Sequence, residues 1–505
     1  MRLRSAYERF LDDSQRMLRI ESADRGRVER APHVVVLGAG LAGLVAADEL
    51  CEPGLRVTVV EAAPFAGGRT ASWVDRANLH CDSGLHVVAG HYQHLRSLLR
   101  RLGGDDALTW QFRHRYVRPG HADLILEHNA LPPPLHLLRT ALRIPLGARM
   151  RMRLARAALR LKVLSAAQIV QLDSQTYGDW RREQGLDSPF IDQLAEFGAD
   201  ACAFLSTEDV SAYTLLTWMR SMSASRQLSA IAPFPGPISK VLIQPLVDSL
   251  VRRGVELLFS CAAVDLEVRQ RRVSAVLLRE TQERSMFSAP DGAPQLARGT
   301  ARRLKADWVI SALPVQALAR LLPAHEAAAF GLERLHALRT VPALSAVVYF
   351  DRKIRPTPGG VALASGYRVR DFVDLTEIWR SPTAAPGSIY QLLMADARLH
   401  LHSDDAAIVA AMLDDLRRAW PPVREARPVA WTVQRVGAAM FAAIPGAYDL
   451  RPAPTTGLEN LFLAGDWTRH DFNASMEGAV FSGRRAAREV RQRSKLNGAC
   501  QTCAE

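Results

Sequence analysis

The stretch His33-Val-Val-Val-Leu-Gly38-Ala-Gly40-Leu-Ala-Gly43 decides the fold. Its first five residues are mostly apolar and predict a buried strand of a parallel sheet, and the apolar run from the glycines to Leu50 predicts a helix. A second strand, Arg56–Val60, ends at Glu61. Strand, glycine turn, helix, strand and acid within about thirty residues predict a dinucleotide-binding unit.

Each residue of this motif has its own physical role. Gly38 allows the tight turn, Gly40 lets the backbone approach a pyrophosphate, and Gly43 lets the helix pack closely on the strand. The helix N-terminus offers free N–H groups and its positive dipole end to the phosphates. Glu61 is expected to accept hydrogen bonds from the adenosine ribose, which favours an unphosphorylated ribose. The alternative, a tight turn in an ordinary α/β protein, does not account for all these features together.

Two further motifs distinguish FAD from a nicotinamide cofactor. Gly67-Gly68-Arg69 follows the second strand, while Leu463-Ala-Gly-Asp466 and Ala474-Ser-Met-Glu-Gly-Ala-Val480 stand near the other end of the chain. They resemble motifs of the FAD-dependent amine oxidase and phytoene desaturase superfamily. The resemblance implies an FAD-binding, Rossmann-like domain of the GR2 type. A helix that begins near Met476 would stabilise negative charge on the reduced flavin.

The chain therefore offers a defined set of expected cofactor and catalytic residues. The expected FAD contacts are Gly38, Gly40, Leu41, Ala42, Gly43, Glu61, Ala62, Gly67, Gly68, Arg69, Val264, Gly465, Asp466, Met476, Glu477 and Ala479. His86 and Glu477 are the catalytic candidates, and a structural or flavin-adjacent role is the alternative for His86. His91 and His94 lie near His86, but no known ligand spacing accompanies them, so we expect no metal site.

More of the chain resembles one branch of the superfamily. Asp82-Ser-Gly-Leu-His86, Trp308-Val-Ile-Ser-Ala-Leu-Pro314 and Ile444-Pro-Gly446 are similar to segments of plant and cyanobacterial-type phytoene and ζ-carotene desaturases. The form Gly465-Asp-Trp-Thr468 is more like the bacterial hydroxysqualene dehydroxylases. The similarity runs through most of residues 31–492. It implies an FAD-dependent oxidoreductase that acts on a long apolar polyisoprenoid by hydride transfer to the flavin, with quinone or oxygen as electron acceptor.

Three alternatives to a carotene-type desaturase remain open. A dehydroxylase of a squalene-type alcohol uses a related substrate. An amine oxidase needs an aromatic cage or an acid for the ammonium, to which Trp431 and Trp467 could contribute. The third alternative is a flavin-binding or lipid-carrier protein without catalytic activity.

The predicted fold class is α/β, with a discontinuous FAD-binding domain and an inserted α+β domain for the substrate. Residues 31–100, 237–340 and 436–495 are assigned to the first domain, and residues 101–236 and 341–435 to the second, membrane-facing one. Strands are expected at 254–259, 263–268 and 273–278 as a meander, and a long helix from Met476 to about Arg491. Residues 1–30 are interpreted as an N-terminal extension and residues 496–505, with the Cys500–Cys503 pair, as a flexible tail.

The net charge of +12 is concentrated in one segment. Residues 128–172 contain no acidic residue, and basic side chains there alternate with apolar ones. No nucleic-acid-binding pattern accompanies them, so an anionic membrane surface is the expected partner and nucleic acid is not. The alternative is a solvated basic helix face. With no signal peptide or spanning segment in the sequence, we expect a cytoplasmic protein bound peripherally at the inner face of the membrane.

Overall fold

The computed structural model describes residues 31–75, 77–118, 121, 123–127, 146–282, 294–356, 361–364, 366–379 and 387–502. For residues 126, 127, 324, 361–364 and 495–502 it describes the backbone only. The predicted N-terminal extension, residues 128–145 of the acid-free segment, residues 283–293 and Cys503 therefore lie outside the described residues.

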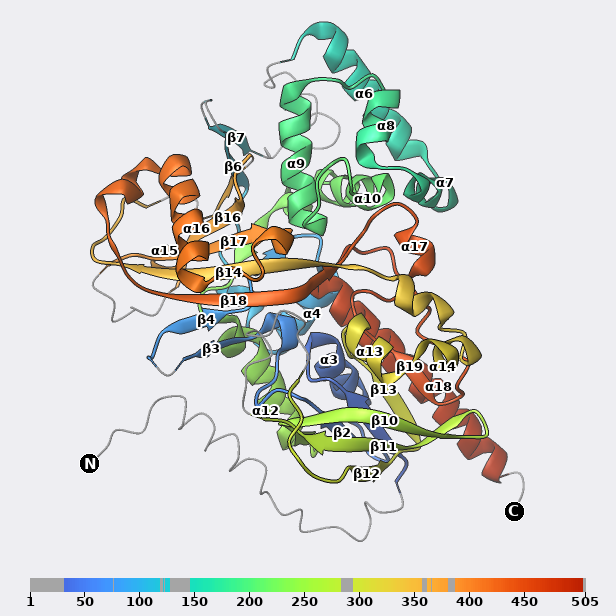
Figure 1. Cartoon of the computed structure of the whole chain (residues 1–505). Helices are drawn as coiled ribbons and strands as arrows, with labels where there is room; N and C mark the ends of the chain where they lie inside the picture. The colour runs from blue at the N-terminus through green and yellow to red at the C-terminus, as the bar shows by residue number, and fades with distance from the viewer. Residues whose placement is uncertain are drawn as a thin grey trace, which may run out of the picture.

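A five-stranded parallel sheet forms the centre of the lower half of the molecule (Figure 1). Its order is β19-β13-β1-β2-β9, with β1 (His33–Leu37), β2 (Arg56–Val60), β9 (Glu256–Leu258), β13 (Trp308–Ser311) and β19 (Leu461–Leu463). β1 pairs in parallel with both β2 and β13, so that Val35 is aligned with Thr58 and Val309. The predicted α/β class with a parallel sheet is confirmed.

Both faces of this sheet are covered, which explains its continuous apolar strands. Val34 and Val36 pack in one core with α3 (Leu41–Leu50), α12 (Gln244–Arg252) and α18 (Met476–Thr502). Val35 and Leu37 point to the opposite core, which contains the antiparallel sheet β10-β11-β12. The strands of that sheet are β10 (Cys261–Arg269), β11 (Arg272–Glu280) and β12 (Arg302–Lys305).

Two sequence predictions in this region need correction. The segment predicted as the first meander strand, 254–259, instead contains β9, which pairs in parallel with β2. It follows α12, and a strand that returns through a helix joins a parallel sheet. The helix predicted to end near Arg491 continues to Thr502, through most of the predicted flexible tail.

A seven-stranded sheet forms the middle layer of the molecule, above the parallel sheet (Figure 1). Its order is β18-β14-β17-β16-β15-β6-β7. The strands are β6 (Arg113–Val117), β7 (Leu124–Glu127), β14 (Thr340–Phe350), β15 (Val361–Ala364), β16 (Val369–Asp374), β17 (Ile389–Ala395) and β18 (Pro428–Phe441). β18 runs across the boundary predicted at 435/436. Two further sheets have two short strands each. One pairs β3 (Ser72–Val74) with β4 (His80–Asp82), and the other pairs β5 (Val87–Ala89) with β8 (Ile231–Pro233).

A group of helices stands above this sheet in Figure 1. It contains α6 (Ala148–Val163), α7 (Ala166–Gln171), α8 (Tyr177–Glu183), α9 (Pro189–Ala203) and α10 (Ala212–Ser223). The other helices are α4 (Gln93–Arg101), α11 (Arg226–Ser229), α13 (Val315–Leu321), α14 (Ala324–Ala329), α15 (Leu375–Ile378), α16 (Asp405–Ala419) and α17 (Ala447–Leu450). Within the described residues, no helix has the length and apolar character needed to cross a bilayer.

Candidate active site at the carboxyl edge of the parallel sheet

The two glycine turns meet at the carboxyl edge of the parallel sheet. The N–H of Gly67 donates to the carbonyl of Ala39 at 2.8 Å, and Gly40 and Gly67 form an isolated parallel bridge. Gly38 and Gly67 have φ of +99° and +121°, a backbone region that L side chains rarely adopt. Ligands of open α/β sheets bind at this edge.

The first turn leaves room for a phosphate group. A Cβ on Gly40 would meet no atom within 4 Å, so a side chain there would project into open space. Gly40 is also the N-cap of α3, and no side chain caps that helix, so the N–H groups at Leu41 and Ala42 face the same space. Gly43 has a different function, because its Cβ would lie 1.9 Å from the carbonyl oxygen of Gly38. It permits close packing of α3.

Glu61 is held at the end of β2 by backbone donors. Its Oε2 accepts from the N–H of Ala39 at 2.7 Å and its Oε1 from the N–H of Ala63 at 2.8 Å. Burial raises the pKa of this carboxyl, and these hydrogen bonds oppose the rise. Each oxygen keeps acceptor capacity for a ribose hydroxyl. Val264, one of the expected FAD contacts, sits where the β10–β11 register shifts and has no partner in that ladder.

Arg69 connects the second glycine turn to the closing motif. Its Nη1 donates to Oδ2 of Asp466 at 3.1 Å and to the carbonyl of Ala439 at 2.8 Å, and its Nη2 donates to Oδ1 of Asp466. Asp466 is 4% exposed, whereas the Arg69 side chain is 34% exposed. The structure thus brings together two expected cofactor residues, 397 positions apart in the sequence. Met476 begins α18 a few residues later.

Glu477, a catalytic candidate from the sequence, makes structural contacts. Its carboxylate accepts from the N–H groups of His94 and Leu95 at 2.9 and 2.8 Å, and the residue is 0% exposed. Burial raises its pKa, opposed by these hydrogen bonds. Glu477 therefore anchors the first turn of α4 beside the start of α18, and its catalytic role stays a prediction.

His86, the other catalytic candidate, lines a cavity next to Arg69. Its Nε2 lies 2.9 Å from the carbonyl oxygen of Arg69 and its Nδ1 lies 3.3 Å from Oδ1 of Asp82. On the other side of Asp82, Nε2 of His80 lies 3.4 Å from Oδ2. Burial raises the pKa of the Asp82 carboxyl, but the two adjacent histidines outweigh it and lower the pKa. A carboxylate between two imidazoles fixes the orientation of His86.

The cavity beside His86 is mostly apolar. Besides Asp82, His86 and Gln391, its lining consists of Leu85, Pro233, Phe234, Gly236, Ile238, Val373, Leu375, Ile378 and Trp379. It holds about 20 Å³, enough for one water molecule. It lies between the residues that follow the second glycine turn and the seven-stranded sheet. A larger ligand must displace side chains there.

Arg451 is a site residue that the sequence motifs did not reveal. It is 3% exposed and donates to the backbone carbonyls of Asp466, Thr468 and His470 at 3.1, 2.5 and 2.8 Å. Burial lowers the pKa of its guanidinium to about 10. Arg451 thus holds the loop between β19 and α18. An isolated arginine in a loop carries no motif, so only the fold reveals this role.

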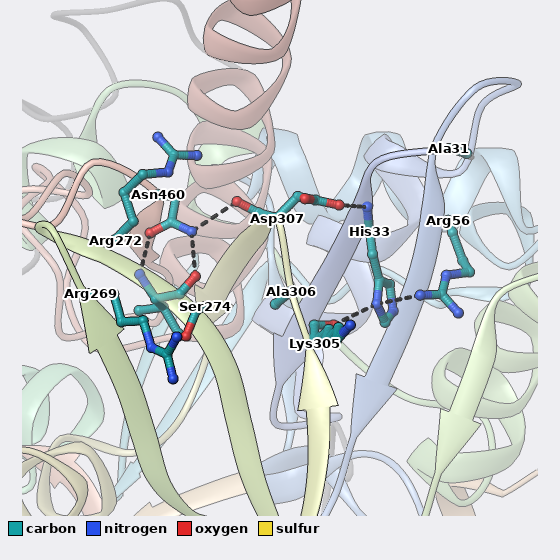
Figure 2. A pocket seen from close by; sticks show the side chains of 11 residues that line it. Ala31, His33, Arg56, Arg269, Arg272, Ser274, Lys305, Ala306, Asp307 and Asn460 are labelled. Atoms are coloured by element: carbon teal, nitrogen blue, oxygen red, sulfur yellow. Dashed lines mark hydrogen bonds between the residues drawn. The ribbon is translucent and has the colours of Figure 1, made fainter. Parts of the chain in front are cut away.

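A second hollow, at the opposite edge of the parallel sheet, does not belong to this site. Figure 2 shows its basic lining, with Arg56 directed at His33, Arg269 at the end of β10 and Lys305 at the end of β12. It measures about 490 Å³. It lies at the amino ends of β1, β2 and β13, away from the glycine turns, so it is not the flavin site.

The structure also bears on two other hypotheses from the sequence, the aromatic cage and the metal site. Trp467 is 2% exposed and its indole N–H donates to the carbonyl of Leu313 at 3.1 Å, whereas Trp431 is 40% exposed. One is a core residue and the other a surface residue, so they do not form a shared aromatic cage. Within the described part of the chain, no three His, Cys, Asp or Glu side chains are placed so that they could hold a metal ion.

These features fit FAD and define the class of protein. The open position at Gly40, the acid at the end of β2 and the Arg69–Asp466 pair lie together at the carboxyl edge of the parallel sheet. The chain is an FAD-dependent oxidoreductase. Residues 41–491 match the model of the flavin containing amine oxidoreductase family, and the chain belongs to that family.

Curated relatives and solved structures agree with this assignment. The chain is 25% identical to a 15-cis-phytoene desaturase of Narcissus pseudonarcissus, over 96% of this chain and 84% of the relative. It is 27% identical to a probable zeta-carotene desaturase of Synechococcus elongatus, over 90% of this chain and 98% of the relative. A putrescine oxidase structure covers 92% of this chain, with a TM-score of 0.62 and 18% identity, and shares its fold. So does an oxidoreductase of Methanosarcina mazei, covering 89% of this chain with a TM-score of 0.65 and 17% identity.

Proposed function

We propose that the enzyme acts on a long apolar polyisoprenoid, as a carotene- or phytoene-type desaturase does. The observation that carries this proposal is the apolar lining of the cavity between His86 and the seven-stranded sheet. The similarity to phytoene and zeta-carotene desaturases over 84% and 98% of their lengths supports it. Quinone or oxygen is the proposed acceptor of the electrons.

The protein's part in this reaction is positioning and exclusion of water. Bound FAD supplies the redox chemistry by accepting a hydride equivalent from a carbon atom of the substrate. Leu85, Phe234 and Trp379 are among the apolar residues that line the cavity, and the Asp82–His86 contact orients the imidazole in its wall. A hydrocarbon has no polar handle, so its recognition depends on the shape of an apolar cavity.

The proposal predicts which compounds reduce the enzyme without oxygen. Addition of phytoene or a squalene-type alcohol in detergent should bleach the oxidised-flavin absorbance of the anaerobic holoenzyme. Putrescine and benzylamine should leave the spectrum unchanged, because Trp467 is a core residue and forms no cage with Trp431. Rapid bleaching by the amines with inert isoprenoids would overturn the proposal and leave the FAD assignment intact.

We also propose that α6 attaches the enzyme to the cytoplasmic face of an anionic membrane. Met152, Leu159 and Val163 are 70%, 64% and 74% exposed and lie along one side of the helix. Exposed basic side chains of the same helix are Arg149, Arg156, Arg160 and Lys162, and no acidic residue occurs in it. A helix with basic and exposed apolar residues fits the interface of an anionic bilayer.

Charge reversal tests this attachment. Replacing Arg149, Arg156 and Lys162 by Glu should abolish flotation with vesicles of phosphatidylglycerol and phosphatidylcholine, and the parent's binding should weaken as salt rises. Arg153 stays unchanged, because it donates to the carbonyl of Gly185 at 2.8 Å and supports the fold.

A triple reversal of equal charge provides the control. Arg298, Arg302 and Lys305 are exposed and lie on or beside β12, at the opposite end of the molecule from α6 in Figure 1. Their reversal should leave flotation nearly unchanged. Equal loss of flotation in both variants would show that net charge, and not α6, determines binding.

A further inference from the structure

Asp371 is a buried carboxyl on the face of the seven-stranded sheet that faces the flavin-binding half. It is 8% exposed and lies on β16, two residues before Val373, with no register shift between them. Alternate residues of a strand share one face. Val373 lines the cavity beside His86, so Asp371 is on the cavity side of the sheet.

The neighbouring strands place further polar groups on this face. Asp371 is aligned with Leu393 of β17, and Leu393 with Ser345 of β14. Gln391, which lines the cavity, donates from Nε2 to Oγ of Ser345 at 3.2 Å. Gln391 and Ser345 therefore lie on the same face of the sheet as Asp371, with Leu393 between Ser345 and Asp371.

Asp371 differs from two other buried carboxyls of this half of the molecule. Asp415 accepts hydrogen bonds from Arg368 and Val369, and Asp374 accepts from the N–H of Thr376. Within the described residues, the Asp371 carboxyl has no hydrogen bond or ion pair. A buried polar group without a partner is costly in a folded protein and commonly marks a ligand site.

The charges around Asp371 determine its ionisation. Burial raises the pKa of the Asp371 carboxyl to about 7, and the guanidinium of Arg370 opposes the rise. Arg370 forms an ion pair with Asp200 of α9 at 3.2 Å, and burial also raises the pKa of Asp200 well above its ordinary value. Near neutral pH, Asp371 is therefore present in part as the neutral acid, which both donates and accepts hydrogen bonds.

We propose that Asp371 is the contact for a hydroxyl group on the polyisoprenoid substrate. This inference rests on the proposed function, and it narrows the substrate class from any apolar polyisoprenoid to one that carries an alcohol. A hydroxyl satisfies either form of the carboxyl, whereas a hydrocarbon leaves it buried and unpaired. Arg370, the positive charge beside the acid, is paired with Asp200, so an amine probe tests whether a cation instead of a hydroxyl completes this site. Sites built to bond a hydroxyl reject analogues that lack it by large factors.

The test compares three ligands of one chain length on the FAD-loaded enzyme. The probes are all-trans-geranylgeraniol, the corresponding C20 hydrocarbon and the corresponding primary amine, each in the same detergent. Binding is followed by the change in flavin absorbance. We expect the alcohol to bind at least about 100-fold more tightly than the hydrocarbon.

Substitutions of Asp371 then show whether this residue causes the preference for the alcohol. Asp371→Leu should lower the affinity for the alcohol to that for the hydrocarbon without changing the latter. Asp371→Asn keeps a hydrogen-bonding group and should keep part of the preference for the alcohol. It is the test variant if Asp371→Leu does not fold. Glu377→Leu, at an exposed position of the adjoining α15, is the control and should bind all three probes as the parent does.

The outcomes separate this inference from the proposed function. Equal affinity of the parent for alcohol and hydrocarbon, preference for the amine, or an unchanged preference in both Asp371 variants would overturn the hydroxyl contact alone. If none of the probes perturbs the flavin while FAD remains bound, the isoprenoid proposal itself fails.

Discussion

Gly40→Leu is expected to yield a folded protein that purifies without FAD. The backbone at Gly40 has φ of −69° and ψ of 171°, which a leucine adopts without strain, and the new Cβ meets no protein atom within 4 Å. The side chain would then occupy the space that the phosphates need. The measurement is the ratio of flavin absorbance to protein absorbance after purification, with circular dichroism to confirm the fold.

The chain offers a closely matched control for this substitution. Gly147 is the N-cap of α6, has φ of −65° and ψ of 157°, and also has open space around its Cβ position. Gly147→Leu makes the same change at the start of another helix and should leave the flavin content at that of the parent. If Gly40→Leu retains stoichiometric FAD, the phosphate site lies elsewhere.

The sequence predicted the carboxyl edge of the parallel sheet well, because the residues that form it lie close together along the chain. The turn at Gly38, the acid at Glu61 and the glycines at 67 and 68 follow within a few dozen residues, and each demands a particular backbone geometry. Asp466 was found from a motif at the far end of the chain. Its ion pair with Arg69 could not be predicted, because it joins residues 397 positions apart through the packing of two segments.

Other features depend on register and burial, which single-sequence patterns describe poorly. Asp371 lies in a strand of mixed apolar and charged residues, and the pairing with β17 shows that it faces the same side as Val373. Glu477 was interpreted as catalytic from its place in a motif, but its hydrogen bonds to the start of α4 come from a contact between residues 383 positions apart. The short β9 was assigned to the wrong sheet, since a three-residue strand has too little periodicity to reveal its partner.

Arg451→Met should destabilise the protein more than any other substitution considered. Methionine fills a similar volume, but the carbonyls of Asp466, Thr468 and His470 would lose their buried donor. A buried acceptor left without a partner costs about 1–3 kcal/mol, so the loss should reach several kcal/mol. Since these carbonyls belong to the loop that carries Asp466, we expect the cofactor to be released at a markedly lower temperature.

Thermal release of FAD, followed by flavin fluorescence at a fixed excess of FAD, measures this effect, because bound ligand itself raises the unfolding temperature. Arg469→Met is the control. Arg469 is exposed and also donates to backbone carbonyls, those of Arg451 and Asp449 at 3.0 and 3.1 Å. Water replaces a lost donor at an exposed site, so this variant should change stability by no more than about 0.5 kcal/mol. Similar release temperatures for the two variants would mean that Arg451 does not hold the closing loop, and that Asp466 is positioned by its pair with Arg69 alone.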